Sequence, residues 1–320
     1  MEALDPDLDR AVETVVKQCL QVQPGENVLV IADTRTRRLG NILREVAAVA
    51  GADAVVVVMD PREVDGEEPP APVAAALAAA DVYIVPTSRS LSHTKARKAA
   101  TDAGARGATL PGVTEEILAR LMACDFPTLQ KRSRALAELL TQADEAHFTC
   151  PRGSDLRLDL TGRAGIADDG TLTGERAFGN LPCGEGFISP CGGEGTLVAT
   201  SLAGVGLVKA EPARLTVDNG HLVAAQGSEG ERYLELLRGA GPQGTNLAEL
   251  GIGTNERATL TGEVIEDEKI LGTVHVAFGA SAGIGGTISV PIHLDCVVLE
   301  PTLDIGSTRV IEAGRFVLDA

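Results

Sequence analysis

The chain has 320 residues, of which 44% are hydrophobic and 2% are aromatic, with no tryptophan. It is long enough for one large domain or two ordinary ones, whose cores must be built from aliphatic side chains. The scarcity of aromatic rings argues against stacking on the bases of single-stranded nucleic acid. A net charge of −17 opposes contact with phosphate backbones, so nucleic acid is not expected as a partner.

The sequence predicts a cytoplasmic protein that makes no contact with membranes. Its first ten residues, MEALDPDLDR, are acidic, whereas a secretory signal is basic and then apolar. No stretch approaches the roughly 20 apolar residues of a spanning helix. The six cysteines are scattered without a Cys-x-x-Cys pair, which indicates reduced thiols.

Residues 1–145 alternate between helical and strand patterns. Short apolar runs that end in a polar residue are typical of buried parallel strands, and helices between them imply right-handed crossovers. We therefore expect an α/β, Rossmann-like domain with a parallel sheet. Helices are predicted over residues 5–20, 36–50, 72–80, 114–123 and 126–143. Strands are predicted over residues 27–33, 54–60 and 82–86, and the segment 90–112 should form a helix and a fourth short strand.

Two features of this first half are candidate binding sites. Asp33 ends the first strand, where open parallel sheets place ligands, but no glycine-rich nucleotide fingerprint follows it. A basic segment comprises Arg89, His93, Lys95, Arg97 and Lys98. It either binds an anionic group, or pairs with the acidic second half, or forms a solvated helix face, and the last interpretation is favoured.

Residues 146–320 have a different pattern, with frequent glycine and threonine and short alternating apolar runs. Such alternation predicts antiparallel strands, among them residues 287–292, and Asn219-Gly220 is a preferred hairpin dipeptide. One helix is expected, over residues 228–240. The fold class is thus an α/β domain followed by a β-rich, α+β domain with a boundary near residue 145.

Five polar residues of this second half stand in apolar or glycine-rich surroundings. His293 and Asp295 are two apart in an apolar run, so in a strand they point to one face. His275 occurs in the similar run GTVHVAFGA. A pair or a lone histidine of this kind also occurs as a structural core residue. Glu249 and Glu185 complete the set, and the glycines beside Glu185 would let the backbone approach a bound ion.

Two imidazoles and three carboxylates suit Zn, Co, Mn or Fe(II), and five ligands exceed one tetrahedral site. A carboxylate that bridges two metals roughly 3.5–4 Å apart would use the whole set. We therefore predict a metal centre of two divalent ions in the β-rich domain. Its predicted ligands are Glu185, Glu249, His275, His293 and Asp295.

At these residues the sequence resembles the metallo-aminopeptidases of the aminopeptidase T and aminopeptidase S type. The matching segments, in chain order, are GNLPCGEGFISP, LAELGIGTN, DEKILGTVHVAFG and PIHLDCVV. The resemblance implies an α/β first domain, a β-rich second domain, a homodimer that encloses a cavity, and two metal ions held by the five residues. Those aminopeptidases carry a tyrosine at the metal centre where this chain has Ala282.

The resemblance predicts a hydrolase that removes N-terminal residues from a small peptide or amino-acid amide. A metal-bridging water would attack the carbonyl, and Glu185 or Glu249 would transfer the proton. Two alternatives remain. A related branch contains dihydroxypyridine dioxygenase, a mononuclear iron enzyme in which a further histidine stands at the position of Glu249, beside the pair that matches His293 and Asp295. The other alternative is a metal-binding relative without catalysis.

Overall fold

The computed structural model describes residues 5–318 and divides the chain into two compact units. The first unit comprises residues 1–124 and 170–183, and the second comprises 125–169 and 184–320. These units do not correspond to a single cut near residue 145. Helix α6 (Phe126–Gln142) packs on strands β7 and β9 of the second unit, and residues 170–183 return to the first.

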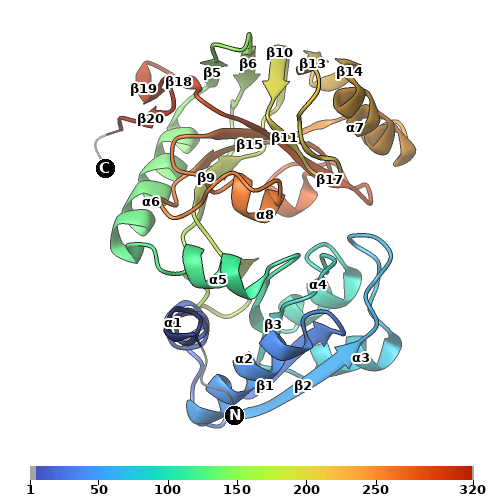
Figure 1. Cartoon of the computed structure of the whole chain (residues 1–320), viewed down its shortest axis with the longest axis vertical. Helices are drawn as coiled ribbons and strands as arrows, with labels where there is room; N and C mark the ends of the chain where they lie inside the picture. The colour runs from blue at the N-terminus through green and yellow to red at the C-terminus, as the bar shows by residue number, and fades with distance from the viewer. Residues whose placement is uncertain (1–4, 319–320) are drawn as a thin grey trace. The chain divides into compact units, whose positions relative to one another are not determined.

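The first unit contains a five-stranded parallel sheet in the order β2-β1-β3-β4-β8. Strands β1, β2 and β3 of this sheet are labelled in Figure 1. The central strands are buried because helices pack along the sheet, as the continuous valine and isoleucine runs require. The strands are β1 (Asn27–Asp33), β2 (Asp53–Met59), β3 (Val82–Val85), β4 (Arg106–Thr109) and β8 (Phe178–Asn180). The α/β expectation is confirmed, although the short strand β8 comes from the segment predicted to be part of the antiparallel half.

Three helices of this unit begin at residues that cap them with a side-chain hydrogen bond. The hydroxyls of Thr94 and Thr114 accept hydrogen bonds from the first-turn amides of α4 and α5, and Asp5 does the same for α1. The helices are α1 (Pro6–Glu13), continued by the π-helix η1 (Thr14–Cys19), α2 (Arg37–Val49), α3 (Ala71–Leu77), α4 (Lys95–Asp102) and α5 (Glu115–Leu121).

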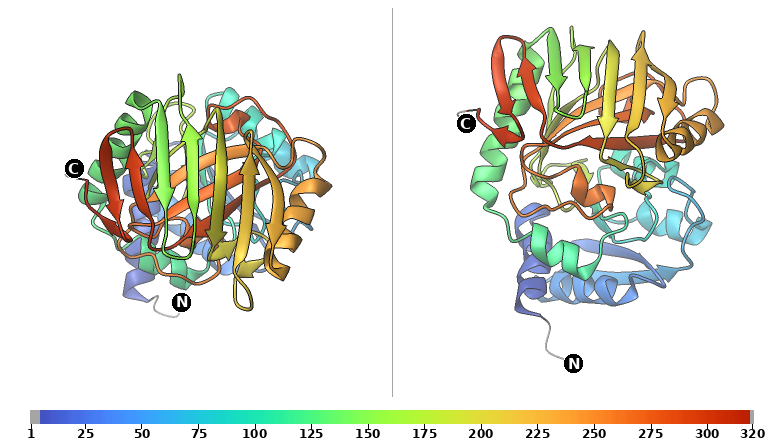
Figure 2. Two further views of the ribbon diagram at one scale, coloured as in Figure 1. Left: turned by 90° about the horizontal axis from the view of Figure 1, so that it is seen from above. Right: turned by 45° about the horizontal axis from the view of Figure 1, so that its top comes forward.

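The second unit is built from two antiparallel sheets that pack face to face, with one hydrophobic core between them (Figure 2). The eight-stranded sheet has the order β14-β13-β10-β6-β5-β18-β19-β20. Its strands are β5 (Glu145–Thr149), β6 (Asp155–Asp159), β10 (Gly192–Ala199), β13 (Ala213–Asp218), β14 (His221–Gln226), β18 (Thr302–Ile305), β19 (Thr308–Glu312) and β20 (Arg315–Phe316).

The seven-stranded sheet has the order β12-β11-β17-β16-β15-β9-β7. Its strands are β7 (Ile166–Asp168), β9 (Glu185–Ile188), β11 (Ser201–Leu202), β12 (Gly206–Leu207), β15 (Leu247–Gly253), β16 (Val274–Gly279) and β17 (His293–Val298). The remaining helices of the unit are α7 (Ser228–Gly239), α8 (Val264–Asp267) and the 3₁₀ turn η2 (Ala282–Ile284). The prediction of a β-rich second half is confirmed.

One predicted strand is wrong. Residues 287–292 form a loop, because Ile288 bonds back to Ser281 instead of to a neighbouring strand: its carbonyl accepts from the amides of Ser281 and Ala282, and its amide donates to the Ser281 hydroxyl. Pro291, which has no N–H, cannot continue a ladder. Within residues 5–318, no helix combines the length and apolar character that a membrane span requires.

Candidate metal centre

The five predicted ligands lie together on four neighbouring strands of the seven-stranded sheet. Glu185 begins β9, Glu249 lies in β15, His275 lies in β16, and His293 and Asp295 lie in β17. In the sheet these strands follow one another in the order β9, β15, β16, β17. Strand pairing therefore assembles side chains that are far apart in the sequence.

The strand register directs these side chains to one face of the sheet. Glu249 pairs with Ala277, which in turn pairs with Asp295, and directly opposed residues point to the same side. Their neighbours in sequence, such as Leu250 and Val276, point the other way and are buried in the hydrophobic core. The polar cluster thus lies on the face opposite that core, with the small Ala277 between two carboxylates.

A glycine in strand β15 makes room for His275. Gly251 pairs with His275, and a Cβ atom on Gly251 would lie 2.0 Å from His275 Nε2. The imidazole therefore lies across bare backbone, where any side chain at 251 would collide with the ring. This requirement accounts for a glycine in the interior of a buried strand, where glycine otherwise weakens the strand.

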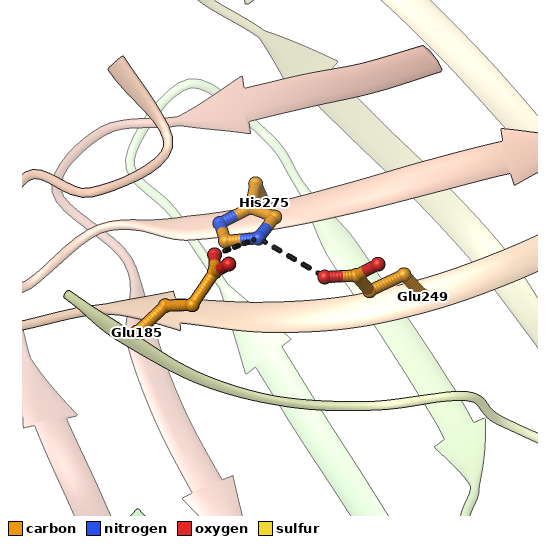
Figure 3. A group of neighbouring side chains, drawn as sticks. All are labelled: Glu185, Glu249 and His275. Atoms are coloured by element: carbon orange, nitrogen blue, oxygen red, sulfur yellow. Dashed lines mark ion pairs between the residues drawn. The ribbon is translucent and has the colours of Figure 1, made fainter. Parts of the chain in front are cut away.

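His275 lies between the carboxylates of Glu185 and Glu249, as Figure 3 shows. Its Nε2 is 2.9 Å from Glu185 Oε2 and 3.5 Å from Glu249 Oε1. Glu185 and Glu249 are each 6% exposed and His275 is 1% exposed. One ligand atom from each residue lies within 4.8 Å of the others, so the three can hold a metal ion.

A second group of three residues shares Glu249 with the first. His293 Nε2 is 3.3 Å from Glu249 Oε2 and 3.8 Å from Asp295 Oδ1. His293 Nδ1 lies 2.7 Å from the carbonyl of Ala280, which suits a proton on Nδ1 and leaves Nε2 toward the carboxylates. These three residues also meet the spacing of a metal site. Glu249 thus directs one oxygen at each histidine.

The hydrogen bonding of the cluster fits a cation better than a closed polar network. Within residues 5–318, neither ring nitrogen of His275 has a hydrogen-bond partner, and the same holds for Glu185 Oε2. The 2.9 Å approach between His275 Nε2 and Glu185 Oε2 lacks the alignment of a hydrogen bond. Buried polar atoms without partners are costly. Nitrogen and carboxylate donors that converge in this way suit Fe(II), Mn, Co or Zn.

In the metal-free protein, protons on the histidines compensate the crowded carboxylates. Burial opposes protonation of His293, but the carboxylates of Asp295 and Glu249 outweigh burial and raise its pKa to about 10. The pKa of His275 is also raised well above its usual value, against burial, by Glu185 and Glu249. Conversely, the histidines lower the pKa of Glu249, although its burial acts in the opposite direction. A divalent ion would take over the charge of these protons.

Three charged neighbours of the cluster were not predicted from the sequence. Lys269 is fully buried, and its Nζ lies 2.5 Å from Glu185 Oε1, 2.8 Å from Glu268 Oε1 and 3.5 Å from Asp168 Oδ2. Burial raises the pKa of Asp168 to about 7 and that of Glu268 to about 8, although Lys269 acts to lower both. The available signal was a lysine at the end of the acidic EDEK segment (266–269), directly before the apolar run ILGTVHVAF.

The two candidate features of the first unit are held by contacts inside that unit. Asp33 is fully buried and accepts hydrogen bonds from the amides of Arg35 and Thr36, and from the amide and hydroxyl of Ser88. These bonds occupy both carboxylate oxygens, which is a structural role at the end of β1.

The basic segment is only partly a solvated face. Arg97 lies over the ring of Phe178, 3.8 Å from its centroid, and its Nε donates to the carbonyl of Ser92. Lys98 is exposed and pairs with Asp102 one helical turn away. The segment therefore divides into one packed arginine and exposed surface charge.

A family model described as NicX, 2,5-dihydroxypyridine 5,6-dioxygenase, matches residues 7–318. The chain belongs to this family. A search of curated proteins found no match.

Two solved structures share the fold. One is a 2,5-dihydroxypyridine dioxygenase from Pseudomonas putida, with a TM-score of 0.84 and 21% identity over 97% of this chain and 96% of that one. The other is AmpT from Thermus thermophilus, with a TM-score of 0.72 and 20% identity over 99% of this chain and 100% of that one. At such identities these likenesses establish the fold alone.

The family match corrects the predicted activity. The expectation of a metallo-aminopeptidase, and with it the terms hydrolase and protease, is wrong, because the full-length match is to a dioxygenase family. The error arose because a dioxygenase and AmpT share this fold, and a fold does not determine the reaction. Ala282, in place of the aminopeptidase tyrosine, was the sequence feature that pointed away from peptide hydrolysis.

Proposed function

We propose that this protein is a metal-dependent dioxygenase that opens the ring of a dihydroxypyridine with O₂. The observation that carries the proposal is the match of the dioxygenase family over residues 7–318. The buried cluster of histidines and carboxylates supports it, because incorporation of O₂ into an aromatic ring needs a redox-active metal or a comparable cofactor.

We propose that Glu249, His293 and Asp295 hold an Fe(II) ion. Bound there, iron would supply the O₂ chemistry that protein side chains lack. The set of one histidine and two carboxylates departs from the two histidines and one carboxylate common in non-haem iron oxygenases. His275, which lies on the other side of Glu249, keeps a second imidazole beside the group.

Glu185 and His275 adjoin this group and complete the proposed centre of five residues. The pKa of Glu185 is lowered, because the charge of Lys269 and the neighbouring His275 outweigh burial. Both Glu185 and Glu249 thus favour the ionised form, which suits binding of a cation or orientation of a neighbouring donor. A role for these two glutamates in proton transfer stays a prediction.

The test is anaerobic loading of the metal-free protein with Fe(II), followed by addition of 2,5-dihydroxypyridine and O₂. We expect loss of the ring absorbance, O₂ uptake equal to the substrate consumed, and two labelled oxygen atoms in the product from ¹⁸O₂. Parallel samples loaded with Zn(II), Co(II) or Mn(II) establish which metal supports turnover. Iron that binds to the protein without any consumption of substrate would contradict the proposal.

Three finer expectations stay predictions. Metal analysis after loading decides between one ion and two per chain. Sedimentation measures whether the chain forms a homodimer. Cell fractionation tests the cytoplasmic location.

A further inference from the structure

A buried cation already contacts one half of the proposed metal centre. Lys269 contacts one of the five proposed ligands, Glu185, and its Nζ lies 2.5 Å from Glu185 Oε1. The other oxygen of Glu185 faces His275 at 2.9 Å. Glu185 is therefore shared between the ammonium group and the position that a metal ion would take.

The backbone holds Lys269 firmly in this place. The carbonyl of Lys269 accepts a hydrogen bond from the amide of Asn255, and a Cβ atom on Gly253 would lie 2.1 Å from the carbonyl oxygen of Ile270. The segment that carries the lysine thus passes in close contact over a bare glycine of β15. Its side chain has 1% exposure, so water does not screen its charge.

The two metal groups consequently differ in their electrostatic surroundings. In the group of Glu185, Glu249 and His275, one carboxylate already has an ammonium partner. In the group of Glu249, His293 and Asp295, both carboxylates face the imidazole of His293, and neither has a lysine partner within the described residues. A metal ion next to Glu185 would meet like charge at short range, because the Lys269 ammonium group is buried against the same carboxylate.

We propose that Lys269 is a positioning residue whose fixed charge weakens cation binding by the Glu185–Glu249–His275 group. The Glu249–His293–Asp295 group therefore takes the first metal ion, and the other group takes a second ion only weakly. The proposal rests on the metal centre inferred above. The charge of Lys269 thus accounts for the difference in cation affinity between the two groups.

The test is titration of the metal-free protein with Mn²⁺, followed by electron paramagnetic resonance, which distinguishes free, bound and exchange-coupled ions. Wild-type protein should bind one Mn²⁺ tightly. Lys269→Met should bind a second ion at least about tenfold more tightly than wild type does, because the competing charge is gone. The coupled signal of two neighbouring ions should appear, and Glu185→Gln in the Lys269→Met background should abolish it.

Two further variants separate the possible outcomes. Lys131→Met makes the same substitution on the exposed face of α6 and should leave the titration unchanged. Lys269→Gln keeps a hydrogen-bond donor and carries the test if Lys269→Met does not fold. If the folded Lys269 variant binds the second Mn²⁺ ion no more tightly than wild type does, the proposal is overturned. Wild-type protein that binds no Mn²⁺ contradicts the metal centre itself.

Discussion

The two units of this protein both place charged or polar side chains at buried positions of a sheet, with different results. In the first unit, Asp33 ends a parallel strand, and both of its carboxylate oxygens accept hydrogen bonds. In the second unit, His275 lies in an antiparallel strand, and neither of its ring nitrogens has a hydrogen-bond partner within the described residues.

The difference shows which property identifies a site. Polar residues in apolar strands occur in both units, so polarity alone does not separate a structural residue from a ligand. Partners that satisfy every atom indicate a structural role, as for Asp33. Donor atoms that converge on one another without hydrogen bonds, such as His275 Nε2 and Glu185 Oε2, indicate a site suited to a cation.

Glu249→Ala should have the largest effect, because Glu249 belongs to both metal groups. We expect a loss of metal affinity greater than the roughly 10–100-fold typical of removing a group that only supports a ligand, and loss of dihydroxypyridine turnover. Calorimetric titration with Mn²⁺ and an oxygen electrode measure the two effects. Retention of wild-type affinity would show that the cluster is a structural network like that of Asp33.

The pH dependence of metal binding should be nearly as large. In the metal-free protein the pKa of His293 is raised from 6.5 to about 10. Stability from its protonated ring is therefore fully present below pH 6.5 and is lost as the pH rises through about 10. A metal displaces this proton, so affinity should rise about tenfold per pH unit for each proton released.

Between about pH 6.5 and 8.5 this amounts to a roughly hundredfold gain in affinity for one proton. Titration in metal buffers at several pH values measures the slope, and proton release into weakly buffered solution counts the protons directly. A flat profile over this range would mean that the histidines bind no metal.

Gly251→Ala tests the close approach of His275 to β15. Because the added Cβ would lie 2.0 Å from His275 Nε2, the ring must move, and we expect a loss of metal affinity of about 10–100-fold. Gly192→Ala is the matched control, since nothing lies within 4 Å of a Cβ at that position of β10. Equal affinities in the two variants would place His275 outside the centre.

Asp33→Asn should have the smallest effect on metal binding. It removes an ionised acceptor that serves five donors, so we expect the free energy of unfolding to fall by about 1–3 kcal/mol. Metal affinity should stay within about twofold of wild type, because the hydrogen bonds of Asp33 lie within the first unit. Denaturant unfolding and Mn²⁺ titration measure the two quantities. A large loss of metal affinity would contradict the purely structural role of Asp33.

The sequence was sufficient for the features that depend on local pattern. Runs such as NVLVIAD specify buried parallel strands, and the spacing of His293 and Asp295 correctly places both on one face of a strand. Such patterns depend on neighbours within one element, which the sequence displays directly.

Long-range features required the structure. No local signal pairs β8 with β4, and nothing in the EDEK segment shows that Lys269 reaches Glu185. The position of Gly251 beneath His275 depends on the register of two strands. The pattern of proposed ligands could not decide between a hydrolase and a dioxygenase, because similar sites on one fold support different reactions.

The order of strands in the sequence has a consequence for folding. Strands β9 and β15 are neighbours in the sheet, yet strands β10 to β14 and helix α7 lie between them along the chain. The proposed ligands meet only after this long stretch of chain has closed, and we expect this closure to be a slow, late step in folding. A metal ion that binds only the finished sheet should therefore slow unfolding and leave the rate of folding nearly unchanged.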